Sequence, residues 1–255
     1  MLKRLFPPKP TPPRGAPGYR AYAIGDIHGH LDLLDRLLAD IRADHAARPL
    51  AAGVLVILGD LIDRGPDSAG VVERLRTFHD PAFRLVGLTG NHEEVLLRVL
   101  DGDEVLLAQW LDFGGTECLA SYGLDRDWLE TMSQADRVAA VRTVIPPEHA
   151  EFLRGFGDTF SFGDYLFVHA GIRPGLPLDE QSPRDLRWIR QEFLDDTSDH
   201  GFVVVHGHTI VELPDVRANR IAIDTGAYRG GPLSALAIDG EERWLMQVGG
   251  EKGLH

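Results

Sequence analysis

One pattern occurs three times near the start of the chain: a short apolar run, a polar turn that contains glycine, and an amphipathic helix. The apolar runs are residues 22–24, 54–58 and 83–88, and each predicts a buried strand. Strands that alternate with helices form parallel sheets, and the turns after such strands meet at one edge of the sheet. The pattern therefore predicts an α/β fold whose ligand site is built from these turns.

The second half of the chain has a different strand pattern. Apolar runs predict strands at residues 159–162, 165–168, 202–205, 221–223, 233–238 and 243–248. Asp239-Gly240, between the last two runs, indicates a tight hairpin. We expect this half to be more antiparallel, which gives a mixed β core flanked by helices, with one helix carrying residues 188–190.

Between residues 101 and 155 the apolar residues have helical spacing, so we expect a helical insert within a single domain of residues 19–250. Residues 1–18 are rich in proline and lack the apolar segment of a signal peptide, so we expect a disordered tail there. No apolar run reaches the roughly 18 residues of a membrane span. A cytoplasmic protein without a membrane partner is the resulting expectation.

Charge and cysteine content restrict the partners. The net charge of the 255 residues is −13, which disfavours a nucleic-acid scaffold. The single cysteine, Cys118, excludes an intramolecular disulfide and a cysteine-ligated zinc cluster. An acidic protein that handles phosphate therefore needs positive charge placed at its site, from arginines or metal ions. The oligomeric state stays open, because no dimerisation heptad is evident.

Residues with metal-binding side chains closely follow the predicted strands. They are Asp26, His28, Asp60, Asn91, His169 and His208. Their oxygen and imidazole donors suit manganese, iron or zinc. Asp60 is central in this set and could bridge two ions about 3.5–4 Å apart. Any one of these residues is more simply a turn former or a helix cap, so the metal-site hypothesis depends on six such positions occurring together.

Four further residues fit roles beside two metal ions. Arg64 and Arg190 are candidates to bind phosphate oxygens, because a guanidinium forms paired hydrogen bonds with them. His92 could protonate a leaving oxygen, with Asp63 holding its imidazole in one tautomer. The alternatives are a surface ion pair between Asp63 and Arg64, and an ordinary exposed arginine at Arg190.

The remaining histidines have simpler interpretations. His30 is expected to start a helix. Those in polar surroundings are expected at the surface: His45, His79, His149, His200 and His255. A ligand role for His206 is left open, because His208 fits the same place.

Five short motifs follow one another along the chain. They are Gly25-Asp26-Ile27-His28-Gly29, Gly59-Asp60 to Asp63-Arg64-Gly65, Gly90-Asn91-His92-Glu93, His169-Ala170-Gly171 and His206-Gly207-His208-Thr209. In order and approximate spacing they resemble the motifs of the phosphoprotein phosphatases, which belong to the calcineurin-like metallophosphoesterases. The short chain resembles the bacterial serine/threonine phosphatases, the bacteriophage lambda phosphatase among them, and also the bacterial diadenosine tetraphosphatases.

The resemblance implies a calcineurin-like fold, a sandwich of two mixed β-sheets with helices outside. It implies one metal ion on Asp26, His28 and Asp60, and a second on Asp60, Asn91, His169 and His208. The family's acid–base pair falls on Asp63 and His92, and its substrate contacts fall on Arg64, Arg190, Asn91 and Tyr228, with weaker matches for Arg190 and Tyr228. The implied mechanism is in-line attack on phosphorus by a hydroxide held between two divalent ions, with manganese expected first and iron or zinc as alternatives.

The resemblance leaves two substrates open. A phosphoserine or phosphothreonine in a protein, or a small phosphoester, is the first expectation, and a dinucleoside polyphosphate is the alternative. Trp110, Phe113 and Tyr122 could stack on a base, or they could be core residues of the insert. A non-catalytic binding module is disfavoured because every proposed ligand is present, and a nucleic-acid phosphodiesterase is disfavoured by the negative charge and by the Asp63-Arg64 pattern.

Overall fold

The computed structural model describes residues 12–250, and it contains two five-stranded sheets. The strands of the first sheet are β1 (Tyr19–Ile24), β2 (Ala52–Ile57), β3 (Phe83–Gly87), β9 (Pro232–Asp239) and β10 (Glu242–Gly249), in the spatial order β10-β9-β1-β2-β3. β1, β2 and β3 are parallel, as their connecting helices require. β9 pairs antiparallel with β1, and the predicted hairpin joins it to β10.

The second sheet has the order β4-β5-β6-β8-β7. Its strands are β4 (Thr159–Phe162), β5 (Tyr165–Val168), β6 (Val203–His206), β7 (Asp215–Val216) and β8 (Arg220–Ala222). The three central strands, β5, β6 and β8, are parallel, and the two edge strands are antiparallel to their neighbours. The prediction of two mixed sheets is confirmed. β7 was not predicted, because its two residues are too few to form an apolar pattern.

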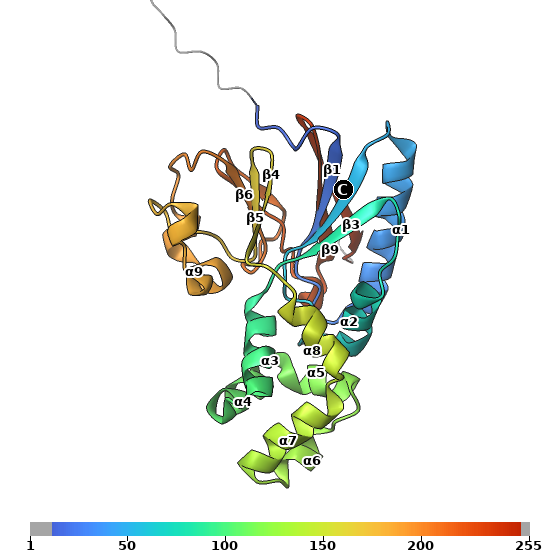
Figure 1. The fold of residues 1–255 in the computed structure, drawn as a ribbon, viewed down its shortest axis with the longest axis vertical. Coiled ribbons are helices and arrows are strands. Elements are labelled where there is room, and N and C mark those ends of the chain that lie inside the picture. Colours follow the sequence, from blue (N-terminus) through green and yellow to red (C-terminus); the bar gives the residue numbers. More distant parts are fainter. Residues whose placement is uncertain (1–11, 251–255) are drawn as a thin grey trace, which may run out of the picture.

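The alternation of side chains along the strands explains the layers. Ala21, Ala23 and Val56 of the first sheet face the second sheet, where they pack with residues such as Val205 and Phe167. Their neighbours along the strands point the other way, into a second core beneath α1 (Leu31–Ala47) and α2 (Ser68–Arg76). Helices α9 (Pro183–Trp188) and α10 (Gln191–Leu194) belong to the outer side of the second sheet. Figure 1 shows the resulting order of helix, sheet, sheet and helix.

Residues 91–154 form helices and join the third parallel strand to β4. The α-helices are α3 (Asn91–Asp101), α4 (Glu104–Trp110), α5 (Thr116–Ser121), α6 (Arg126–Glu130), α7 (Gln134–Val144) and α8 (Pro147–Arg154). A kinked segment, Leu111–Gly115, lies between α4 and α5, and the φ of 109° at Gly114 interrupts the helical backbone there. These helices lie together beyond one end of the two sheets (Figure 1), which is the end that carries the parallel strands' carboxyl termini.

Local sequence explains where these helices begin and end. α4, α6 and α7 begin after Asp103, Asp125 and Ser133, each of which accepts a hydrogen bond from a backbone N–H of the first turn. α3 ends at Gly102, whose φ of 111° suits glycine because it has no Cβ. None of the helices in residues 12–250 combines the length and the hydrophobicity of a membrane-spanning segment.

Four expectations differ from the structure, and one of them concerns His200, whose side chain is 4% exposed instead of lying at the surface. Residues 1–11 lie outside the described residues, but the later part of the expected tail is packed: Arg14 and Gly15 donate backbone hydrogen bonds to Asp164 and Gly240. Arg190 lies between α9 and α10 rather than within a helix, with φ −132° and ψ −102°. His149 is buried instead of exposed, because Tyr122 and Glu73 bind its two ring nitrogens.

Candidate binuclear metal centre

The parallel strands of both sheets end at one place, and the loops after them have strained backbones. Among the described residues, five that are not glycine have positive φ: His28 at 45°, Asp60 at 47°, Asp63 at 73°, Arg64 at 67° and His208 at 62°. A Cβ makes this conformation unfavourable, and it persists only where the surrounding structure holds it. All five are predicted site residues, so the strain in the described chain is concentrated at the predicted site.

Two of the predicted ligand histidines are anchored through Nδ1. His28 Nδ1 lies 2.8 Å from the carbonyl oxygen of Ile62, and His169 Nδ1 lies 2.7 Å from that of Leu58. A carbonyl only accepts, so each Nδ1 carries the proton and each Nε2 presents a lone pair to the site. Burial lowers the pKa of both imidazoles, to about 3 for His28, which keeps them neutral as metal ligands must be.

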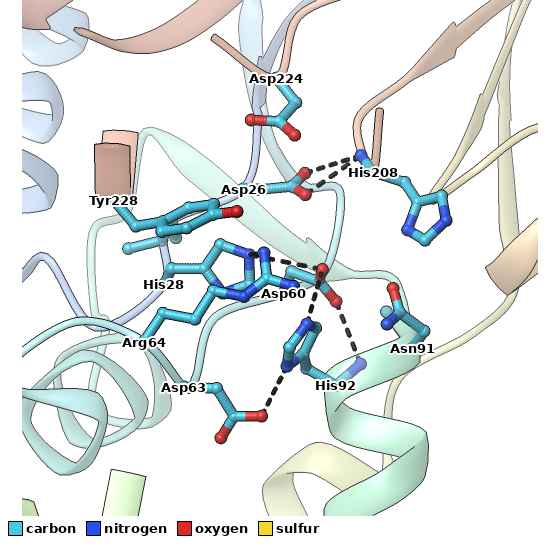
Figure 2. A network of polar contacts seen from close by, with 12 residues as sticks. Asp26, His28, Asp60, Asp63, Arg64, Asn91, His92, His208, Asp224 and Tyr228 are labelled. Carbon is cyan, nitrogen blue, oxygen red and sulfur yellow. Dashed lines mark hydrogen bonds and ion pairs between the residues drawn. The ribbon is translucent and has the colours of Figure 1, made fainter. Parts of the chain in front are cut away.

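Asp60 lies between two groups of potential ligands (Figure 2). Its Oδ2 is 3.6 Å from Nε2 of His28 and 3.8 Å from Nε2 of His92, and its Oδ1 is 3.4 Å from Nε2 of His169. Burial raises the pKa of this carboxyl, but the surrounding histidines outweigh burial and the pKa lies well below its ordinary value. An ionised carboxylate with one oxygen facing each group has the geometry of a bridging ligand.

The second group contains Asp60, His169 and His208 as possible metal-binding residues. His169 Nε2 lies 2.9 Å from Oδ1 of Asn91 and 3.2 Å from Nδ1 of His208. The lone pair of His169 thus faces an amide oxygen and a carboxylate oxygen with no proton between them. Converging acceptors repel each other unless a cation lies among them, so these residues fit a metal ion.

Asp26 is close to this arrangement but outside both groups. Its two carboxylate oxygens each lie 3.1 Å from the backbone nitrogen of His208, which donates to them (Figure 2). Burial and the neighbouring carboxylate of Asp224 raise the pKa of Asp26. The first group instead contains His28, Asp60 and His92. The role of Asp26 as a metal ligand therefore stays a prediction.

Asp224 was missed by the sequence analysis. It follows β8 as the predicted ligands follow their strands, so the same strand-end signal could have found it. It is buried, it accepts a hydrogen bond from Gly226 N at 3.0 Å, and burial raises its pKa to about 6. Its position beside Asp26 makes it a carboxylate of the same site.

Glu93 was also missed as a functional residue. Its fully buried carboxylate accepts backbone hydrogen bonds from Asp60 and Leu61 at 2.8 Å and from Gly90 at 2.9 Å. Burial raises its pKa to about 7. These bonds tie the loop after β2 to the start of α3, and so hold Asp60 in its strained conformation. A glutamate three residues after Gly90, at the start of a helix, is a capping pattern that the sequence already contains.

His92 and Asp63 form the predicted pair. His92 Nδ1 lies 2.5 Å from Oδ2 of Asp63, and both side chains are buried. Burial alone would lower the pKa of His92, but the Asp60 and Asp63 carboxylates outweigh it and the pKa lies above its ordinary value. A raised pKa favours a protonated imidazole, which is the form that donates a proton. The alternative surface ion pair between Asp63 and Arg64 does not form, because Asp63 is buried against His92.

The predicted phosphate-binding residues occupy different positions around the groups. Arg64 Nη1 donates to Nε2 of His28 at 2.9 Å, and its guanidinium lies 4.5 Å from the ring centre of Tyr228 (Figure 2). The Tyr228 ring is also 5.0 Å from the His28 ring. Arg190 is exposed and donates to Oγ1 of Thr209, next to His208. Arg64 and Tyr228 are therefore brought to the first group, and Arg190 approaches the second group from solvent.

His206, whose role was left open, is not in either group. It is fully buried, its Nδ1 lies 3.1 Å from the carbonyl oxygen of Gly207, and burial lowers its pKa to about 3. Its ring packs against Phe193 with the ring centres 5.1 Å apart. It is a core histidine at the end of β6.

The three aromatic residues of the insert have three different environments. Trp110 is buried and Tyr122 donates to or accepts from His149 at 2.9 Å, away from the ligands. Phe113 is exposed and borders a cavity of about 410 Å³ that Arg64 and Tyr228 also line. They do not form one base-stacking surface, because only Phe113 reaches the cavity.

The site has two groups of acceptor atoms, each suited to a cation, and the guanidinium of Arg64 lies beside them. A metal-dependent phosphoester hydrolase requires this combination. The chain belongs to the calcineurin-like phosphoesterase family, whose profile matches residues 19–235. It is a hydrolase of the metallophosphoesterase superfamily, a family that uses divalent metal ions.

Relatives of two kinds are similar to the chain over most of its length. It is 29% identical to serine/threonine-protein phosphatase 1 of Salmonella typhimurium, over 85% of this chain and 91% of the relative. It is 28% identical to the symmetrical bis(5'-nucleosyl)-tetraphosphatase of Dechloromonas aromatica, over 89% of this chain and 95% of the relative. A solved structure described as a putative diadenosine tetraphosphatase has the same fold, with a TM-score of 0.65, 22% identity, and coverage of 93% of this chain and 96% of that one.

Proposed function

We propose that this protein is a phosphomonoester hydrolase whose substrates are phosphoserine and phosphothreonine side chains of proteins. The observation that carries the proposal is the Asp60 carboxylate, with one oxygen facing each of two histidine groups. Two divalent ions held there would supply a nucleophile from water at neutral pH and polarise the phosphoryl group. Manganese is the first metal to test, because oxygen and imidazole ligands accept it, with iron or zinc as alternatives.

The residues of the chain divide the remaining work. Arg64, which faces the first group, binds the equatorial oxygens of the phosphoryl group, and Arg190 does so from the side of His208. His92 donates a proton to the leaving oxygen, and Asp63 keeps its imidazole oriented. Asn91 and Tyr228 border the same space and would contact the bound phosphoester.

The cavity beside Arg64 favours a protein substrate. Its lining carries the exposed carboxylates of Asp112 and Glu117 together with two arginines, Arg64 and Arg126. Arg126 lies 3.9 Å from Asp112 and also pairs with Glu130. A group attached to the phosphate would extend into this space. Because two arginines match these two carboxylates, the lining accepts a neutral peptide side chain and offers no excess positive charge to a chain of further phosphates.

A dinucleoside polyphosphate is the second candidate. The exposed ring of Phe113 and the ring of Tyr228 line the same cavity, and about 410 Å³ is enough for a nucleoside. Relatives named as tetraphosphatases support this candidate as well. It ranks second because the cavity lining offers no excess positive charge for the additional phosphates and because Trp110 and Tyr122 form hydrogen bonds with other residues.

The deciding experiment measures kcat/KM of the manganese-loaded enzyme on a phosphothreonine peptide and on diadenosine tetraphosphate. We expect the peptide to be preferred by at least about tenfold, which is roughly 1.4 kcal/mol of transition-state binding. A preference for the dinucleotide would replace the first candidate by the second. No turnover of either substrate, with two ions bound, would reject both.

A further inference from the structure

The carboxylate of Asp63, which holds His92, is covered by the helical insert. Trp110, the last residue of α4, donates its indole Nε1–H to Oδ2 of Asp63 over 2.8 Å. The same oxygen lies 2.5 Å from Nδ1 of His92. Cys118 of α5 also lies against this carboxylate, and burial raises the pKa of its thiol. Trp110 and Asp63, which are 47 positions apart in the chain, are thus joined at the carboxylate oxygen that also binds His92.

The contact is buried. Asp63 is 0% exposed and Trp110 is 1% exposed, so bulk water does not reach the oxygen that they share. An indole nitrogen can only donate, so the direction of this hydrogen bond is certain, and its partner must accept. Asp63 Oδ2 therefore receives two donors, one from Trp110 and one from His92.

The loop that carries Asp63 gives its side chain little other support. Asp63 lies outside helices and strands, its φ is 73°, and its backbone nitrogen donates to Oγ of Ser68. That backbone bond places the main chain but does not set the direction in which the carboxylate points. The indole bond adds a second donor to the oxygen that His92 binds, and so restrains the direction from which this oxygen meets the imidazole.

We propose that Trp110 is a positioning residue of the reaction, whose indole N–H orients Asp63 and thereby directs His92 at the leaving oxygen. The proposal rests on the proton-donor role of His92 in the proposed function. Because the hydrogen bond comes from α4, the helical insert would contribute to proton donation as well as to packing. Trp110 acts through Asp63 and does not touch the substrate.

The test removes the N–H and keeps the ring, with Trp110→Phe as the variant. A proton donor matters for an alkoxide leaving group and hardly matters for p-nitrophenolate. We expect kcat to fall about tenfold on a phosphothreonine peptide and about twofold on p-nitrophenyl phosphate, with KM changed by less than about twofold. Trp128→Phe is the matched control, because Trp128 belongs to α6 of the same insert, is exposed, and should show no leaving-group dependence.

Equal losses on the two substrates would overturn the proposal and leave Trp110 a packing residue. Because Phe is smaller than Trp, a benzothienyl-alanine at this position, which keeps both rings but has sulfur in place of N–H, provides a second variant that preserves packing. It should show the same selective loss on the peptide, and full peptide activity of this variant would also overturn the proposal.

A double-mutant comparison separates this inference from the proposed function. In an Asp63→Asn background, Trp110→Phe should cause less than about a twofold further loss, because the two residues act through one contact. If His92→Asn itself shows no leaving-group dependence, the proton-donor role has failed. If His92→Asn is selective for the peptide and Trp110→Phe is not, only the role of Trp110 has failed.

Discussion

At the scale of single residues, backbone strain and ligand geometry occur at the same positions. Residues with a Cβ in the left-handed region each cost about 1–3 kcal/mol. In this protein the strain falls on His28, Asp60, Asp63, Arg64 and His208, all of which lie in loops that follow the parallel strands. Glu93 offsets part of the cost, because its carboxylate binds three backbone N–H groups, two of them in the loop of Asp60.

Replacing His92 tests whether it is a proton donor or a ligand. His92→Asn should lower kcat about 100-fold or more, as expected for loss of a general acid, while the metal content stays near two ions per chain. Both roles are compatible with the geometry, because His92 Nε2 lies 3.8 Å from Asp60 Oδ2, within the first group of potential ligands. Metal analysis of the purified variant gives the answer, and loss of one ion would make His92 a ligand.

Replacing Arg190 tests the more exposed of the two arginines that are proposed to bind phosphate. Arg190→Ala should raise the inhibition constant for inorganic phosphate about tenfold, because a charge-assisted hydrogen bond to the anion is lost. Arg217→Ala serves as the control, since Arg217 is an exposed arginine that pairs with Asp215 at the edge of the second sheet. Unchanged inhibition in the Arg190 variant would identify that residue as an ordinary surface arginine.

At the scale of elements, the insert and the central loop are joined at two points. Trp110 binds Asp63, and the carbonyl oxygen of Gly114 in the kinked segment accepts the backbone N–H of Arg64 at 3.0 Å. The insert therefore contacts both the proposed acid–base pair and the proposed phosphate-binding arginine from one short stretch of chain.

The second contact predicts that Gly114 cannot be replaced. Its φ is 109°, and a Cβ would lie 2.6 Å from Cγ and 2.7 Å from N of Arg64. Gly114→Ala should reduce kcat/KM about tenfold or more on p-nitrophenyl phosphate, because displacement of Arg64 weakens binding of the phosphoryl group.

Gly123→Ala is the control that separates the effect of backbone strain at a glycine of the insert from the effect of a clash with Arg64. Gly123 also has positive φ, at 83°, but a Cβ there would meet no atom within 4 Å. Its variant should lose some thermal stability and keep its activity. Equal kinetic losses in the two variants would show that strain in the insert, rather than contact with Arg64, is responsible.

At the scale of the whole molecule, the site is shared by two sheets. His28 and Asp60 follow strands of the first sheet, whereas His169 and His208 follow strands of the second. A ligand that binds residues of both sheets stabilises the folded state, because the unfolded chain cannot present these residues together.

Manganese should therefore raise the melting temperature of the chelator-treated protein. At about 100 times the dissociation constant, one site contributes about 2.7 kcal/mol, which corresponds to roughly 5–10 °C for a chain of this size. Asp60→Asn should lose most of this shift, because one residue contacts both groups. A shift that persists in that variant would mean that manganese binds elsewhere.

Much of the fold and of the site follows from local patterns. Alternation of apolar runs with helices predicted the parallel strands, and polar residues after strand ends predicted Asp60, Asn91 and His169. Glu93 and Asp224 also have local signals, a capping position at the start of α3 and a position after the end of β8. Trp110 has no such signal. The spacing of apolar residues in a helix is the same whether the indole only packs or also donates a hydrogen bond.

Side-chain chemistry and local periodicity were enough to predict which residues could bind metals and in which order the strands would present them. Which atoms face each other depends on the packing of distant parts of the chain. This packing places His92 rather than Asp26 in the first group, and it brings Trp110 to Asp63. Those contacts join residues far apart in the chain, and their distances depend on how the sheets and the insert pack, which no local pattern records.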